Sequence, residues 1–307
     1  AASDVYKRQI NGFVPAGTET FTNVLTYASR SGQFESVNVA GLTVNYGANG
    51  LVIGAGSIPV ACPTGFDVCW IGTGSGSWSD PTKWNTGTVP TAANNVFVSA
   101  PGSITITASA GGTVNRLVSE ESFLLSGGTF QLTGASSIDQ TLTITGGTFQ
   151  ANAALVAGAI DLSGGSAIFN ASVSTSLLTQ ISPSILGGSG TLTLTGIGST
   201  FSGGQWTGGG TTRLASGADI TLSGTNSGTS IAARTLDIVS GATATLNGEI
   251  ELDGAAVIDN AGTLNLSGSR ISNVFNTSGT LEVTNTGTLN KSGTGVYACL
   301  LYTSDAA

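Results

Sequence analysis

The chain of 307 residues contains 46 Gly, 7 Pro and no His, and it carries a net charge of −8 on 9 basic and 17 acidic residues. So few charges exclude a coiled coil or an α-helical repeat, which need abundant Ala, Glu, Lys, Leu and Arg. The absence of His excludes a Ser-His-Asp triad, an HExxH zinc site and a histidine proton relay. No cluster of Lys and Arg is present to neutralise phosphates, so nucleic acid is not an expected partner.

The two ends differ in composition from the rest of the chain. Residues 1–9 and 297–307 resemble peptides that arise when sequencing-adapter reads are translated, and we interpret both as non-native tails. Because the chain contains no Met, we expect it to be part of a longer chain. No apolar run reaches the roughly 18–20 residues that a membrane-spanning helix needs, so no membrane span is expected.

Residues 10–58 form the first structured segment that the sequence predicts. Apolar and polar side chains alternate here, and Tyr27, Phe34 and Tyr46 add large apolar groups. Such alternation is typical of half-buried strands. We predict a β segment of three or four strands that ends a preceding unit, with a boundary near residues 55–63.

Tryptophan is concentrated in the next segment, residues 59–100. Trp70, Trp78 and Trp84 are three of the four tryptophans of the chain, and they lie where the sequence does not repeat. The end of a stack of strands exposes unpaired backbone and apolar side chains and needs a cap. We interpret residues 59–100 as a linker and a Trp-rich cap, with these three side chains as its structural core.

Two cysteines precede the first tryptophan in the phrase CPTGFDVC. The short loop between Cys62 and Cys69, with Pro63 and Gly65 to turn it, could close a disulfide in an oxidising compartment. The alternative is that both are small buried apolar residues. CxxC spacing is absent, so a zinc site is not expected. The third cysteine, Cys299, falls in the C-terminal tail.

From about Gly111 the chain repeats. The phrases LLSGGTF (124–130), TITGGTF (143–149) and DLSGGSA (161–167) place paired glycines 19 and 18 residues apart. A repeat of this length with strands and no helices indicates a β-solenoid, in which stacked rungs bury a continuous apolar column. We predict an all-β fold: a right-handed parallel β-helix (β-solenoid) over residues 101–296, with about ten rungs spaced ~4.8 Å apart.

Several phrases resemble those of known bacterial surface proteins. Residues 70–100, with the pattern W…GxWSDPxxWxxGxVPxxxNNVxV, resemble the opening of β-helical repeat regions in large secreted autotransporter-like and adhesin-like proteins. Residues 24–53 and 203–224 resemble, respectively, closing strands and a rung phrase of filamentous-haemagglutinin-like passengers. The resemblance implies export, surface display and a structural or adhesive role, and it supplies no catalytic residues. Where that pattern usually has Asp-Asp, this chain has Asn94 and Asn95, which argues against a cation there.

Few residues qualify as candidates for chemistry. Glu249, Glu251 and Asp253 alternate along a predicted strand and would share one face, where they could attract a hard cation or simply solubilise the surface. Glu120 and Glu121 are adjacent, so we expect them on a solvated edge rather than in a hydrolase carboxylate pair. Single aspartates recur about once per rung and are interpreted as lone corner or outer-face residues, at positions Asp161, Asp219, Asp237 and Asp259.

The sequence therefore predicts a structural or adhesive segment of an exported bacterial surface protein, located at the cell surface or secreted. Its faces would be rich in Thr, Ser and Asn, with glycans or host and bacterial surface proteins as partners. No cofactor, metal or catalytic residue is predicted, and we do not expect an enzyme. The alternative is a carbohydrate-active β-helix enzyme of the polysaccharide lyase or hydrolase type, which would need converging carboxylates and a base on one lateral face.

Overall fold

The computed structural model describes residues 20–26, 43–46, 50–54, 62–224, 229–248, 250–267, 271–272 and 282–292. The chain divides into two compact units, Ala1–Pro63 and Thr64–Ala307. The two expected tails, residues 1–9 and 297–307, lie outside the described residues. Within the described part the fold is all-β, with one short 3-10 helix, η1 (Pro81–Lys83), and no helix that is long and apolar enough to cross a membrane.

The described residues of the first unit form a three-stranded antiparallel sheet. Its strands are β1 (Thr20–Thr26), β2 (Thr43–Tyr46) and β3 (Gly50–Gly54), in the order β1-β3-β2. The pairing of Val44 with Ile53 and of Phe21 with Ile53 places β3 at the centre. The sequence predicted three or four strands in residues 10–58, and the described residues contain three.

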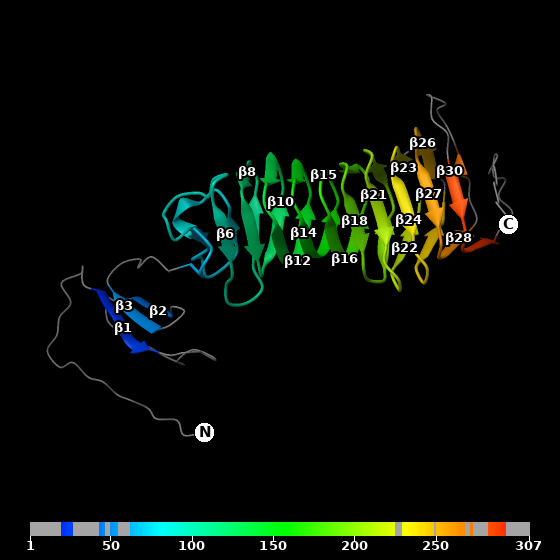
Figure 1. The fold of residues 1–307 in the computed structure, drawn as a ribbon. Helices are drawn as coiled ribbons and strands as arrows, with labels where there is room; N and C mark the ends of the chain where they lie inside the picture. Colours follow the sequence, from blue (N-terminus) through cyan, green and yellow to red (C-terminus); the bar gives the residue numbers. More distant parts are fainter. Residues whose placement is uncertain are drawn as a thin grey trace, which may run out of the picture. The chain divides into compact units, whose positions relative to one another are not determined.

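The second unit is a β-solenoid of parallel rungs that stack along one axis (Figure 1). One side of the coil is a nine-stranded sheet. It consists of β8 (Gly111–Val114), β11 (Thr129–Leu132), β13 (Thr148–Ala151), β15 (Gly165–Phe169), β17 (Ser184–Gly187), β20 (Gly204–Trp206), β23 (Thr229–Ala232), β26 (Ile250–Asp253) and β29 (Ile271–Ser272).

The remaining strands form a 19-stranded sheet that supplies two further faces. It consists of β4 (Val68–Cys69), β5 (Gly76–Ser77), β6 (Asn95–Val98), β7 (Thr105–Ala108), β9 (Arg116–Ser119), β10 (Ser122–Leu125), β12 (Ser136–Ile144), β14 (Leu155–Leu162), β16 (Val173–Gln180), β18 (Thr191–Leu194), β19 (Ser199–Phe201), β21 (Thr211–Leu214), β22 (Asp219–Leu222), β24 (Thr235–Ile238), β25 (Thr243–Leu246), β27 (Val257–Asn260), β28 (Thr263–Ser267), β30 (Glu282–Asn285) and β31 (Thr288–Ser292). The two faces meet in the long strands β12, β14 and β16, where the β12–β14 register shifts between Ile138 and Thr141.

Stacking follows the sequence repeat at first and then departs from it. The early rungs pair Thr129 with Thr148 and Thr148 with Ser166, which reproduces the spacings of 19 and 18 residues. Later rungs pair Gln205 with Ser230 and Ser230 with Glu251, so they take 25 and 21 residues. Because the later rungs are longer, the same length of chain forms fewer turns. The solenoid has about eight turns, whereas the sequence predicted about ten.

The paired glycines of the repeat form one corner of the coil. Gly128, Gly147 and Gly165 adopt positive φ values of 68°, 75° and 63°. A Cβ added at Gly147 would lie 2.2 Å from the carbonyl oxygen of Gly128, and one at Gly165 would lie 2.4 Å from that of Gly147. Each corner therefore needs glycine for its backbone conformation and for the close approach of the rung beneath it.

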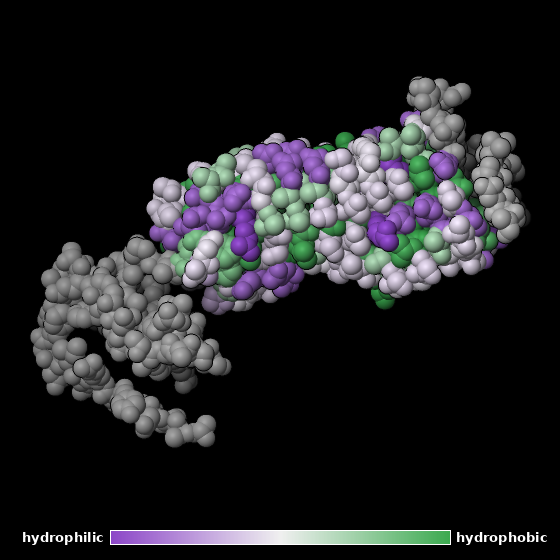
Figure 2. Space-filling model, in the orientation of Figure 1, coloured by the Kyte–Doolittle hydropathy of each residue, from purple (hydrophilic) through white to green (hydrophobic). Residues whose placement is uncertain are grey.

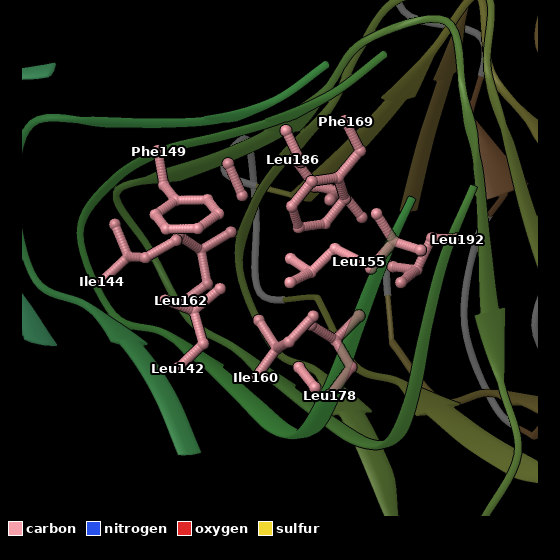
Figure 3. Close-up of a cluster of buried hydrophobic side chains, with 14 of the residues drawn as sticks. Leu142, Ile144, Phe149, Leu155, Ile160, Leu162, Phe169, Leu178, Leu186 and Leu192 are labelled. Carbon is pink, nitrogen blue, oxygen red and sulfur yellow. The ribbon is translucent and has the colours of Figure 1, made fainter. Parts of the chain in front are cut away.

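The interior is one continuous apolar column. Inward positions on most strands of the described solenoid belong to a single cluster of buried Leu, Ile, Val, Phe, Ala and Trp side chains. Figure 3 shows its central part, where Leu142, Ile160 and Leu178 from successive rungs line one side of the interior and Phe149 and Phe169 from the nine-stranded sheet line the opposite side. Because one rung buries little apolar surface alone, this stacking supplies most of the hydrophobic stabilisation.

Candidate interaction surface

The three predicted cap tryptophans come together at the N-terminal end of the solenoid. Trp70, Trp78 and Trp84 are 4 %, 1 % and 1 % exposed. Trp70 and Trp84 meet edge to face with ring centroids 5.0 Å apart, and Trp84 meets Trp78 at 4.8 Å. Trp78 in turn packs edge to face on Phe130 at 4.8 Å, which joins the cap to the first full rungs.

Local backbone structure holds this cluster in place. The Trp84 indole N–H donates to the carbonyl of Trp78 over 2.9 Å. Between them Asp80 caps η1 by accepting from the backbone N–H of Thr82, and hydrogen bonds from Thr82 lower the pKa of the Asp80 carboxyl. With their rings inside the core, the three tryptophans contribute stability, and they are not available as stacking platforms for a sugar ring.

The cap segment also continues the ladder of the solenoid. Strand β4 pairs in parallel with β6, and β5 pairs with β7, so parallel stacking reaches back to Val68. Cys69 in β4 is buried, and both Cys62 and Cys69 are disulfide-bonded. The pairing of these two cysteines with each other stays a prediction.

The outward side chains of one solenoid face form a column of hydroxyl and amide groups. We call this column, together with the column described next, the hydroxyl face. Successive strand pairings place its residues in direct register: Thr107, Leu124, Thr143, Asp161, Thr179, Thr200, Thr221, Thr245, Asn265 and Asn290. Six of these ten residues are Thr and two are Asn. With rungs ~4.8 Å apart, the column presents one short polar group on each of its rungs except that of Leu124.

A second column, mostly of hydroxyl side chains but interrupted by Ile181 and Asn247, runs along the ends of the same strands. Each of its residues donates its backbone N–H to the rung before, as Ser126 does to Ala108, Thr145 to Leu125 and Ser223 to Phe201. The side-chain hydroxyls of Thr145 and Ser202 point back in the same direction, since they reach the carbonyls of Leu125 and Gln180 at 3.4 Å each. On the side of the solenoid that Figure 2 shows, much of the surface is pale, with purple patches between, and the dark green areas are small and separate.

A charged column lies on the other face of the 19-stranded sheet. Arg213, Asp237 and Asp259 are register partners on three successive strands, β21, β24 and β27. The Arg213 guanidinium binds the Asp237 carboxylate over 2.7 Å, with the two side chains 50 % and 20 % exposed. The prediction that these aspartates stand alone is wrong for Asp237 and Asp259, because stacking brings residues 22 positions apart side by side.

The other acidic candidates separate into two groups. On β26, Glu251 and Asp253 face outward while Ile250 and Leu252 are buried, as the alternation predicted, but Glu249 lies outside the described residues. Among the residues that the structure describes, no three His, Cys, Asp or Glu side chains gather as a metal site would require.

The solvated edge predicted for Glu120 and Glu121 is wrong for Glu121. This side chain is 6 % exposed, and its carboxylate accepts the backbone N–H groups of Ala100 at 3.2 Å and Ile104 at 3.1 Å. Glu120, by contrast, stays at the surface and accepts from the hydroxyl of Ser99. Glu121 thus satisfies backbone donors of the loop between β6 and β7, which a sequence cannot show because the loop is 17 to 21 residues away.

No family model, curated protein or solved structure matches this chain. The arrangement of its own residues is therefore the basis for any functional conclusion.

Proposed function

We propose that this chain is a structural or adhesive segment of an exported bacterial surface protein, located at the cell surface or secreted. The observation that carries the proposal is the hydroxyl face, in which Thr and Asn recur in register on five successive rungs from Thr179 to Asn265. A rigid column that repeats one polar group at each rung suits weak contacts made many times. Such contacts add up to useful avidity when partner sites also repeat, as they do in glycans and on cell surfaces.

The chemistry of this face fits neutral partners better than charged ones. Its hydroxyl and amide groups both donate and accept hydrogen bonds. Asp161 is the one ionisable group among the ten residues of the column from Thr107 to Asn290, so long-range electrostatic attraction contributes little to binding there. We therefore favour glycans or uncharged protein surfaces as partners, with no cofactor.

Binding in multivalent form tests this proposal. The full chain would be coupled to beads, and retention on immobilised neutral polysaccharide would be compared with that of free chain. We expect the triple variant Thr200→Ala, Thr221→Ala, Thr245→Ala to lose most of the bead retention. A matched triple variant on the charged column's face, Thr193→Ala, Thr235→Ala, Thr284→Ala, should keep it. Equal retention of both variants would contradict an adhesive hydroxyl face.

A carbohydrate-active enzyme is the second candidate function, and the charged column is the observation that favours it. Two carboxylates on neighbouring strands beside a guanidinium are the groups that polysaccharide cleavage uses, with rungs ~4.8 Å apart. The same groups are accounted for by a surface ion pair between Arg213 and Asp237, which is half-exposed. Depolymerisation of polygalacturonate or alginate by the full chain, abolished by Asp237→Asn or Asp259→Asn, would establish the enzyme in place of the adhesive segment.

A further inference from the structure

Arg234 carries its charge inside the solenoid. The residue is 1 % exposed. Its Nε donates to the hydroxyl of Thr212 over 3.0 Å, and its Nη2 donates to the carbonyl of Thr211 over 3.1 Å. Its Nη1 reaches the carbonyls of Gly188 at 3.3 Å and Thr207 at 3.4 Å. These four partners are neutral, so the guanidinium has hydrogen bonds but no carboxylate among them.

The side chain runs parallel to the solenoid axis through space that glycines leave open. Backbone hydrogen bonds from Thr211 to Gly190 and from Thr235 to Gly210 place Gly190, Gly210 and Arg234 at the same corner of three successive rungs. A Cβ added at Gly210 would lie 2.8 Å from Nη1 of Arg234. The corner is therefore shaped around this guanidinium, which extends over the two rungs that precede its own.

Placing a charge here has an energetic cost that an apolar residue would avoid. Burial lowers the pKa of Arg234 to about 10. An isolated buried charge is unfavourable, and apolar replacements of buried ionic groups are frequently neutral or stabilising. The equivalent corner of the following rung is occupied by Ala256, which is buried without such a group. Arg234 differs from an apolar side chain because its guanidinium needs hydrogen-bond acceptors at fixed places. It therefore favours the one stacking of rungs that supplies them.

Selection of neighbours matters because the rungs are nearly interchangeable. Strands β22, β24 and β25 all alternate half-exposed and buried residues in the same order. A displacement by one whole rung would keep this order of inward and outward positions on the strands. Hydrophobic burial alone therefore specifies the stacking order weakly, as it does in other uniform strands.

We propose that Arg234 is a register lock, a buried cation that fixes which rungs stack beneath β24 by binding acceptors on two preceding rungs at once. A chain whose β24 stacked on any other rung would leave the guanidinium buried without these four partners. That penalty raises the free energy of displaced stackings. In the native stacking Nε, Nη1 and Nη2 of Arg234 all donate hydrogen bonds. The inference concerns how the fold is specified and does not depend on the proposed function.

Distance measurement between two spin labels tests the lock. Labels would be attached to cysteines at Thr179→Cys and Asn265→Cys on the hydroxyl face, in the full chain with Cys299→Ser. These positions are separated by four strand pairings, or about 19 Å for rungs ~4.8 Å apart. We expect one distance for the native sequence. Arg234→Met should add a population about 4.8 Å shorter, in which one rung loops out.

Arg213→Met is the matched control, because it removes the same charge from an exposed arginine of the preceding rung. It should leave the single distance unchanged. A single native distance in Arg234→Met would overturn the proposal. If that variant lacks the circular dichroism of a β-sheet, Arg234→Lys replaces it, since one ammonium cannot reach all the acceptors. An unchanged distance in Arg234→Lys, or failure of both variants to fold, would overturn the proposal as well.

Discussion

Trp206 donates its indole N–H to the side-chain oxygen of Gln180 over 2.8 Å, with both side chains completely buried. The Gln180 amide nitrogen reaches the carbonyls of Ser184 and Gln205 at 3.4 Å each, and the Trp206 ring stacks on Phe201 with centroids 4.8 Å apart. The pair is thus a polar link between two rungs inside a column that is mostly apolar. Each member satisfies the other, so loss of one leaves the other without its partner.

The link predicts non-additive mutations. Gln180→Leu should destabilise the protein by about 1–3 kcal/mol, because the indole N–H of Trp206 then stays buried and unpaired. Trp206→Phe removes the same donor, so the double variant should cost less than the sum of the two single variants. Denaturant unfolding of the four proteins measures the coupling. Strict additivity would show that the hydrogen bond contributes nothing.

The glycine corner predicts a large difference between two identical substitutions. Gly147→Ala should destabilise the solenoid by more than about 1 kcal/mol, since alanine at positive φ is strained and its Cβ would press on the Gly128 carbonyl. Gly74→Ala is the control, because a Cβ there would meet no atom within 4 Å. Thermal unfolding compares the two, and similar melting temperatures would contradict the account of the corner.

The cap predicts graded effects at its tryptophans. Trp78→Ala should cost about 3–5 kcal/mol, because it leaves a cavity at the junction with Phe130. Trp84→Phe should cost more than Trp78→Phe by about 0.5–1.5 kcal/mol, because Trp84 alone donates to the Trp78 carbonyl. The Trp78 indole N–H has no hydrogen-bond partner to lose. Chemical denaturation orders the three variants, and an unchanged midpoint for Trp78→Ala would remove the capping role.

Arg234 predicts an alkaline pH dependence of stability. Burial lowers the pKa of Arg234 to about 10 in the folded protein, below the value of the same group in the unfolded chain, so above pH 10 the unfolded chain binds more protons. Stability of the native sequence relative to Arg234→Met should therefore rise as pH increases above 10, with a slope of up to about 1.4 kcal/mol per pH unit. Below pH 10 the difference should be flat. Unfolding of both proteins across this range provides the measurement, and a falling difference would contradict the buried charge.

The sequence predicted those features that depend on neighbours along the chain. The alternation of apolar side chains in TLTLTG and LNLSG identified the inward positions, and Leu192 and Leu264 are buried as expected. The double glycines at 127–128 and 146–147 marked the repeat, and the structure places a corner of the coil at each. Clustering of Trp70, Trp78 and Trp84 in one non-repeating segment predicted a cap, and all three are buried.

The features that the sequence did not show depend on which rungs stack. Arg234 looks like an isolated surface charge in the sequence, and its four partners lie 22 to 46 residues upstream. Asp237 and Asp259 looked single for the same reason. Rung length is set by turns that vary after Pro183, so the repeat of the early rungs predicted too many turns. A period identifies the architecture, whereas the register between unequal rungs follows from contacts distant in sequence.

Parallel stacking also determines how this molecule would respond to tension. The backbone hydrogen bonds of each rung go to the rungs next to it. A pull on the C-terminal side should therefore detach the rungs one after another. The force needed at each step is that of a few strand bonds, except at β24. There the Arg234 side chain donates hydrogen bonds to Gly188 and Thr207 on the two preceding rungs. We therefore expect a higher unfolding force at this rung before the N-terminal half unwinds.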